Sequence, residues 1–235
     1  MVKICWHLYE MLKQFNLGKQ KFTVEDTEAT KTDDWDFWSF YAGGQWETTT
    51  VAAADKLLKG GDLLFDIGAW VGPLTLWEAS RGVKVIAVEP DPIAFELLRR
   101  NVIINGFENL VTFVHKAVTN GESDKVILNF RGSGGDAWSS IIPREDLPGS
   151  VEVETITIPE MFKIYGHPKV IKMDIEGGES LVIPAVGEFL RKNRIPLLLA
   201  THGQWYAEGS EKGMEDELSK WNITDLHNQM WLCKS

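Results

Sequence analysis

Short apolar runs alternate with helical segments from about residue 63 to the C-terminus. The apolar runs are LLFDI, KVIAVE, VTFVH, VIKMDI and PLLLATH, and the segments among them include TLWEAS, IAFELLRRNVII and ESLVIPAVGEFLRK. Strands that alternate with helices predict right-handed βαβ units and a parallel sheet. Runs this apolar are typical of strands that are covered on both faces. We therefore expect an α/β fold of the Rossmann-like type.

Two segments break the alternation. The insertion at 124–158 holds VILNF, a Gly/Ser-rich stretch and VEVETITI, which predict an extra hairpin with a loop over the crevice. The chain ends with WNITDL, a short turn and QMWLCK. Strands joined by so short a turn must be antiparallel. A mostly parallel sheet that ends in an antiparallel C-terminal hairpin is typical of class I methyltransferases that use S-adenosylmethionine (SAM), and not of NAD-binding Rossmann domains.

The N-terminal part differs in pattern from the rest. Residues 1–16 have apolar positions near helical spacing, which predicts an amphipathic helix. Residues 20–48 are polar with interleaved aromatics and are expected to wrap the edge of the domain. A helix over about 49–58 would end at Gly60 and Gly61. We thus expect an N-terminal cap segment over 1–48 and a SAM-binding domain over 49–235.

Composition restricts the partners. The chain has 235 residues, 44% of them hydrophobic, and a formal net charge of −10. A surface this acidic repels phosphate backbones, so nucleic acid is not an expected partner. No leader or membrane-spanning run is visible, which predicts a soluble, cytoplasmic protein with no membrane partner. Cys5 and Cys233 are expected to be free thiols.

The first chemical motif is a glycine loop directly after the LLF run. Gly68 lets the backbone turn sharply, and Gly72 lies where the next helix begins. The helix N-terminus would offer free N–H groups to a carboxylate, and Asp66 would accept hydrogen bonds from an ammonium group. A zwitterionic amino-acid tail suits such a site, whereas a pyrophosphate would be repelled by Asp66.

The second motif is Glu89-Pro90 at the end of the second apolar run. A carboxylate at this position can accept both ribose hydroxyls of a nucleoside. Asp66 and Glu89 together predict a site for an adenosyl amino acid, which is SAM. The alternative, a dinucleotide oxidoreductase, would need a GxGxxG loop without the leading Asp.

At this point the sequence resembles the FkbM family of methyltransferases. The matching segments are GQWETTT, LLFDIGAWVGPLTL, VIAVEPDPIAFELLRRNVIING, HKAV and VIKMDIEGGESLVIPA, in the family's order. The resemblance implies SAM as methyl donor and a hydroxyl, often on a sugar or a polyketide-like molecule, as acceptor. With the motifs above, it gives an expected cofactor set of Glu47, Asp66, Gly68, Ala69, Trp70, Gly72, Thr75, Glu89, Pro90, Ala117 and Asp174.

Three positions depart from the family pattern. Trp70 stands where the family commonly has Asn, and Pro73 stands where it commonly has an aromatic residue. After the fifth strand the family commonly has a Glu shortly before a His, but this chain has Ala200 before His202. Position 200 therefore offers no carboxylate, while His202 remains.

Methyl transfer to a hydroxyl requires that donor and acceptor are positioned for reaction and that a nearby group accepts the hydroxyl proton. SAM carries the reactivity, but a hydroxyl attacks well only if its proton is removed. Asp174, Glu176 and His202 lie at the carboxyl ends of two predicted strands and are the expected catalytic residues. Glu179 starts the next helix and is expected to fix the loop. Two mechanisms stay open: His202 or Asp174 acts as base, or Asp174, Glu176 and His202 bind Mg²⁺ or Mn²⁺.

The acceptor is expected to be a small molecule or glycan, and a sugar is favoured. Ten tryptophans are present, and indole rings pack on the C–H faces of sugars. Trp138, Trp205 and Tyr206 are expected acceptor contacts, whereas the aromatics of 35–41 are expected mainly to pack the cap segment. Alternatives are an N-methyltransferase, an O-methyltransferase of a non-sugar molecule, and a non-catalytic SAM-fold domain of a larger sugar-modifying protein. The sequence does not predict the oligomeric state.

Overall fold

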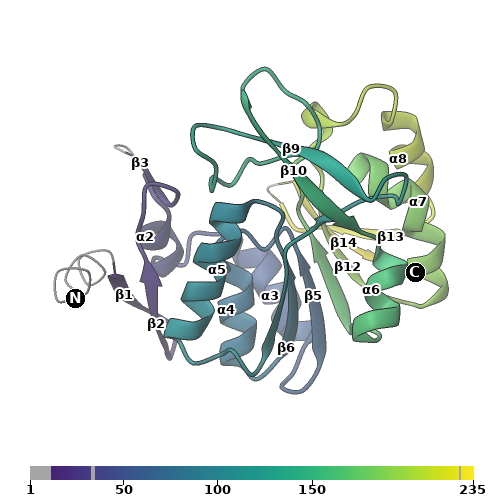
Figure 1. Ribbon diagram of the computed structural model, residues 1–235. Coiled ribbons are helices and arrows are strands. Elements are labelled where there is room, and N and C mark those ends of the chain that lie inside the picture. The colour runs from purple at the N-terminus through teal and green to yellow at the C-terminus, as the bar shows by residue number, and fades with distance from the viewer. Residues whose placement is uncertain (1–11, 33–34, 228) are drawn as a thin grey trace.

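The computed structural model describes residues 12–32, 35–227 and 229–235 and has a central seven-stranded sheet (Figure 1). The strand order is β13-β14-β12-β11-β5-β6-β7. The strands are β5 (Leu63–Ile67), β6 (Lys84–Val88), β7 (Val111–Val114), β11 (Val170–Met173), β12 (Leu197–Ala200), β13 (Asn222–Asp225) and β14 (Met230–Lys234). They include each apolar run that the sequence predicts to be a strand.

The pairing of these strands confirms the predicted fold class. β7, β6, β5, β11 and β12 pair in parallel, and β14 pairs antiparallel with both β12 and β13. The sheet is thus mostly parallel and ends in an antiparallel C-terminal hairpin. The chain order reverses at β5, which lies between β6 and β11. Ligands of open α/β sheets bind at such a switch point, beyond the carboxyl ends of the strands.

Helices cover both faces of the sheet (Figure 1). Successive strand side chains point to opposite faces, so Leu64 joins one buried core and Phe65 joins the other. The first core is completed by α3 (Thr48–Leu57), α4 (Pro73–Ser80) and α5 (Pro92–Ile104). The second core is completed by α6 (Ile158–Tyr165), α7 (Glu179–Lys192) and α8 (Glu211–Leu218).

The N-terminal segment has a different secondary structure from the one predicted from the sequence. β1 (Leu12–Leu17) pairs antiparallel with β2 (Gln20–Glu25), so the helix predicted over 1–16 is wrong at residues 12–16. Residues 1–11 lie outside the described part of the chain. The two-residue connection has Gly18 at φ 57°, and such positive-φ turns favour hairpins. Phe15 faces Phe22 across the pair, with ring centroids 5.7 Å apart. This cross-strand packing outweighs the helical spacing of the apolar residues.

The aromatic part of the cap segment packs onto the first core. β3 (Lys31–Thr32), β4 (Trp35–Asp36) and α2 (Phe37–Ala42) follow β2. Trp38 and Tyr41 are buried, and the Tyr41 hydroxyl donates a hydrogen bond to the carbonyl of Pro73. Trp38 and Tyr41 therefore have the packing role that was expected for the aromatic residues of 35–41.

The insertion forms a second, smaller sheet. β8 (Ala117–Val118), β9 (Lys125–Phe130) and β10 (Gly149–Ile156) lie in the order β8-β10-β9, and β9 pairs antiparallel with β10. The predicted extra hairpin is thus confirmed. Cys233 is a buried free thiol, and Cys5 lies outside the described residues. None of the helices in the described ranges combines the length and the hydropathy that a membrane crossing requires.

Candidate cofactor and catalytic site

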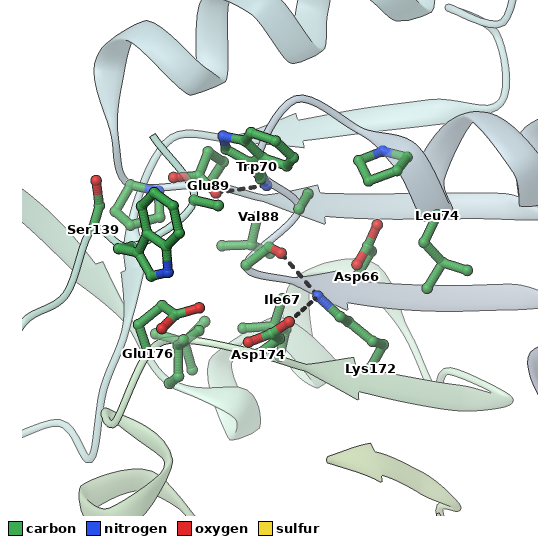
Figure 2. Close-up of a pocket in the computed structure, with 18 of the residues that line it drawn as sticks. Asp66, Ile67, Trp70, Leu74, Val88, Glu89, Ser139, Lys172, Asp174 and Glu176 are labelled. Atoms are coloured by element: carbon green, nitrogen blue, oxygen red, sulfur yellow. Dashed lines mark hydrogen bonds and ion pairs between the residues drawn. The ribbon is translucent and has the colours of Figure 1, made fainter. Parts of the chain in front are cut away.

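A cavity of about 280 Å³ lies at the carboxyl ends of β5, β6, β11 and β12 (Figure 2). Most of the residues expected from the sequence line it: Glu47, Asp66, Gly68, Ala69, Trp70, Glu89, Pro90, Ala117, Trp138, Asp174, Glu176 and His202. Four expected residues lie outside the lining: Gly72, Thr75, Trp205 and Tyr206. The parallel strands thus bring together residues that are up to 155 positions apart in sequence, because Glu47 and His202 both line the cavity.

The glycine loop is shaped by close backbone contact. Gly68 has φ 74°, and a Cβ there would lie 1.7 Å from the carbonyl oxygen of Asp174. Gly72 has φ 93°, and a Cβ there would lie 2.7 Å from Leu98 Cδ1. Gly68 therefore lets β5 and β11 approach at the site, whereas Gly72 serves loop and helix packing.

Gly68→Ala is expected to disrupt the site, because the new methyl group would overlap the Asp174 carbonyl. We expect a loss of thermal stability well beyond the roughly 1–2 kcal/mol of left-handed backbone strain, together with loss of SAM binding. The matched control is Gly106→Ala, since Gly106 has φ 73° with nothing within 4 Å of its Cβ position. Thermal unfolding and SAM titration measure both effects. Equal losses in the two variants would show that backbone strain alone is at work.

The amides of this loop are engaged within the protein. Four of them, those of Gly68, Ala69, Trp70 and Gly72, donate hydrogen bonds to other protein groups. Pro73 has no N–H to offer. Free N–H groups for a carboxylate were expected at this helix N-terminus, and of its first two positions Gly72 has its amide engaged and Pro73 has none.

The position of the Glu89 carboxyl group suits the recognition of a pair of hydroxyls. Its Oε2 accepts a hydrogen bond of 2.8 Å from the Trp70 amide (Figure 2), and its Oε1 accepts one of 2.8 Å from the Asp91 amide. The side chain is buried, and burial raises the pKa of Glu89 to about 8. Each carboxylate oxygen keeps further lone-pair capacity toward the cavity. This geometry suits the two hydroxyls of a ribose.

A second acidic group lies at the β5–β11 end of the cavity. Glu47 Oε2, Asp66 Oδ1 and Asp174 Oδ1 are buried oxygens with no hydrogen-bond partner among the described residues. Thr75, which lies outside the lining, donates from its hydroxyl to the other oxygen of Asp66 at 2.6 Å. Burial raises the pKa of Glu47 to about 7 and also raises that of Asp66. The unpartnered oxygens of Glu47 and Asp66 suit an ammonium group, whereas Asp174 Oδ1 faces His202.

Lys172 lies among these carboxylates and was not identified from the sequence. Its Nζ donates to the Gly68 carbonyl at 3.0 Å and lies 3.4 Å from Asp174 Oδ2 (Figure 2). Burial disfavours the ammonium, but the carboxylates of Asp174, Asp66 and Glu47 outweigh burial and raise the pKa of Lys172 above its ordinary value. The sequence feature that could have identified Lys172 is its position as a charged residue within the apolar run VIKM. A lysine in a fully buried strand needs a partner for its charge.

The expected catalytic residues meet at the opposite side of Asp174. His202 Nε2 lies 3.7 Å from Asp174 Oδ1 and 3.7 Å from Glu176 Oε1. His202 Nδ1 lies 3.3 Å from Glu179 Oε1, which is fully buried and also accepts a hydrogen bond from the Ile175 amide. Because a carboxylate only accepts, Nδ1 carries a proton and Nε2 faces the other two acids.

The protonation of His202 is set by its acidic neighbours. Burial would lower its pKa, but the hydrogen bond to Glu179 and the charges of Asp174 and Glu176 raise the pKa of His202 to about 9. The imidazole therefore carries a proton at neutral pH before cofactor binds, and it must lose that proton before it can act as a base. Burial and the Asp174 charge also raise the pKa of Glu176 to about 8.

Three non-glycine residues of the cavity have left-handed backbone conformations. They are Glu47 at φ 36°, Trp70 at φ 49° and Glu176 at φ 55°. Such conformations cost free energy and concentrate at functional sites. Their presence around one cavity supports its assignment as the functional site.

The tryptophans expected at the acceptor have different surroundings. Trp138 lines the cavity from the insertion, with Arg131 over its ring at 4.4 Å. Trp205 instead stacks on His202, with ring centroids 5.2 Å apart and an interplanar angle of 14°. Tyr206 packs against the second core. Trp205 thus orients the imidazole rather than lining the cavity.

Trp70, which departs from the family pattern, joins the two segments that flank the cofactor loop. Its Nε1 donates to the Gly135 carbonyl at 2.8 Å, and its ring meets that of Phe37 edge-on at 4.5 Å. Trp70 thus contacts both the cap segment and the insertion.

Comparison with solved structures supports the fold. An FkbM methyltransferase from Methylobacillus flagellatus has a TM-score of 0.51 and 17% identity, over 80% of this chain and 47% of that one. The 16S rRNA N2 G1207 methyltransferase of T. Thermophilus, solved with AdoMet and guanosine, has a TM-score of 0.51 and 15% identity, over 95% and 49% of the two chains.

Curated relatives match the chain over shorter stretches. Ribosomal protein L11 methyltransferase of Clostridium perfringens is 33% identical over 94 residues, which are 38% of this chain and 30% of that protein. A tRNA (guanine(37)-N(1))-methyltransferase of Trichomonas vaginalis is 28% identical over 53% of this chain and 35% of that protein. The chain thus spans about a third of the length of these relatives.

The family profile described as the Methyltransferase FkbM domain matches residues 66–231, which reach from the cofactor loop to the C-terminal hairpin. This range includes Asp66, Glu89, Asp174 and His202 of the cavity. The chain therefore belongs to the FkbM family of SAM-dependent methyltransferases.

Proposed function

We propose that this protein transfers the methyl group of SAM to a hydroxyl group of a sugar-like small molecule or glycan. The observation that carries the proposal is the position of His202, Asp174 and Glu176, which line the same cavity as the cofactor residues. A donor site and a proton-accepting group are therefore available within one enclosure.

The proposed reaction is a direct in-line displacement. His202 Nε2 takes the proton of the acceptor hydroxyl, the hydroxyl oxygen bonds to the methyl carbon, and the carbon–sulfur bond breaks. The sulfur keeps the electron pair, so the sulfonium becomes a neutral thioether. Glu179 holds Nδ1 and so directs Nε2 toward the cavity. The positive sulfonium favours loss of the imidazole proton before reaction, because like charges in a buried site repel.

A second mechanism uses the same residues to bind a divalent cation. Asp174, Glu176 and His202 each offer a ligand atom, and these atoms lie within 4.8 Å of one another. The donor set fits Mg²⁺ or Mn²⁺, and the Glu179 hydrogen bond to Nδ1 is a common partner of a metal-bound histidine. A bound cation would polarise the acceptor hydroxyl. Loss of turnover in a chelator, restored by Mn²⁺, would favour this mechanism.

The sugar assignment rests on the wall that the insertion contributes to the cavity. Trp138 and Ile141 give an apolar surface, and Asp136 and Ser139 give hydrogen-bonding groups beside it. A sugar needs both, one for its C–H face and one for its hydroxyl edge. Two similar methyltransferases above act on ribosomal or transfer RNA, but the net charge of −10 disfavours an RNA partner here.

The test is an assay for methyl transfer from SAM to a panel of sugars, amines, non-sugar alcohols and structured RNA. Mass spectrometry of each acceptor identifies the product. Methylated sugar supports the proposal. Methylation of an amine, a non-sugar alcohol or RNA would replace it, and no transfer to any acceptor with SAM still bound would indicate a non-catalytic SAM-binding domain.

Trp138→Ala tests the acceptor wall. Removing the indole takes away packing surface, so we expect the KM for the acceptor to rise roughly tenfold while the Kd for SAM stays within about twofold. Steady-state kinetics and calorimetry measure the two constants. A loss of SAM affinity instead would assign Trp138 to the cofactor site.

A further inference from the structure

The methionine part of SAM carries two opposite charges that the cavity must bind. The unpartnered oxygens of Glu47 and Asp66 suit the ammonium group, as described above. These same carboxylates would repel the carboxylate of the cofactor unless a cation lies between them. The partner of that carboxylate is therefore the open question at this end of the cavity.

Most amides of the glycine loop are not available as this partner. The amides of Gly68, Ala69, Trp70 and Gly72 are already used within the protein, and Pro73 has none. Among the described residues that line the cavity, the cationic side chains are Lys116, Lys172 and His202. Lys116 pairs with Glu154 at 2.9 Å, and His202 lies with the catalytic acids.

Lys172 is placed and equipped for the role. It is only 4% exposed, yet it lines the cavity, and Figure 2 shows its ammonium between Asp66 and Asp174. An ammonium has three donors, and the Gly68 carbonyl and Asp174 account for two of them. These two contacts fix Nζ, so the third donor is available at a defined position beside the glycine loop.

We propose that Lys172 binds the carboxylate of the methionine moiety of SAM, while Glu47 and Asp66 bind its ammonium. This assignment rests on SAM as the cofactor. It makes Lys172 a specificity-determining residue: the site selects a nucleoside cofactor that keeps its amino-acid carboxylate. The competing account is that Lys172 only neutralises the surrounding carboxylates.

The two accounts predict different effects of a Lys172 substitution on the binding of ligands with and without the carboxylate. Calorimetric titration of the wild type and Lys172→Met with SAM and with decarboxylated SAM separates them. We expect the substitution to weaken SAM binding by about 10- to 100-fold, since a hydrogen bond between charged groups is lost. Binding of decarboxylated SAM should change by no more than about threefold. The wild type itself should prefer SAM, and the variant should lose that preference.

Matched variants separate charge from folding. Lys169→Met removes an exposed lysine just before the same strand and should bind both ligands as the wild type does. Lys172→Arg keeps a positive charge and should keep part of the preference for SAM. Thermal unfolding of each variant shows whether it is folded.

Three outcomes would overturn the proposal. Equal losses for both ligands would leave Lys172 as a neutralising group only, and an unchanged affinity for SAM would exclude the contact. Equal affinity of the wild type for the two ligands would also overturn it, even if Lys172→Met does not fold. Binding of neither ligand by the wild type would instead contradict SAM as the cofactor.

Discussion

Glu89→Gln is expected to weaken SAM binding by about 10- to 100-fold. The carboxylate of Glu89 is fixed by the Trp70 and Asp91 amides and faces the cavity. Donation from two ribose hydroxyls favours the ionised form of Glu89 in the complex. Hydrogen bonds to a charged acceptor contribute roughly 1.5–3 kcal/mol, and each 1.4 kcal/mol corresponds to about tenfold in Kd. Calorimetry with SAM measures the loss. The control Glu108→Gln, at an exposed position, should bind as the wild type does.

The same substitution changes how stability depends on pH. The pKa of Glu89 is about 8 in the folded protein, against an ordinary value of 4.5. Between these values the folded protein keeps a proton that the unfolded chain has lost, so this group makes the wild type less stable as pH rises. Gln does not titrate. The unfolding free energy of the variant relative to the wild type should therefore increase from about pH 5 to pH 8. A constant difference over that range would contradict the buried, protonated state of Glu89.

His202→Gln is expected to lower kcat by about 100- to 10,000-fold, which is the range for loss of a general base. The Kd for SAM should change little, because His202 lies beyond Asp174 from the cofactor residues. His167→Gln is the control, since His167 is exposed and contacts the ring of Phe162 instead. An unchanged kcat in His202→Gln would move the proton acceptor to Asp174.

The pH dependence of the wild-type reaction rate also tests the role of His202 as the base. With a pKa of about 9, His202 must lose its proton before it can accept one, so the rate should rise with pH above neutrality. A bound divalent cation would replace that proton and shift the rise to lower pH. Rate profiles with chelator and with Mn²⁺ therefore distinguish the two mechanisms.

The sheet and much of the cofactor site could be predicted because their signals are local. The fully apolar runs define the parallel strands, and the loops after them define where Asp66, Glu89 and Asp174 meet. Glu47 required the family resemblance, because nothing in its own neighbourhood indicates that the start of α3 reaches the cavity.

Other features depend on contacts between distant segments. Leu12 to Phe15 have helical spacing, yet pairing with β2 makes them a strand. Trp205 looks like an acceptor contact until its stacking on His202 is seen. Lys172 could have been found from its position in a buried strand, but its partners come from β5 and from the segment before α3. Periodicity does not reveal such partners.

The most direct test of the account is calorimetric titration of the purified protein with SAM and, separately, with NAD. The account predicts micromolar binding of SAM at one site, no binding of NAD, and loss of most SAM affinity in Glu89→Gln. No binding of SAM under any condition, with or without Mg²⁺ or Mn²⁺, would contradict the assignment of the cavity as a methyl-donor site.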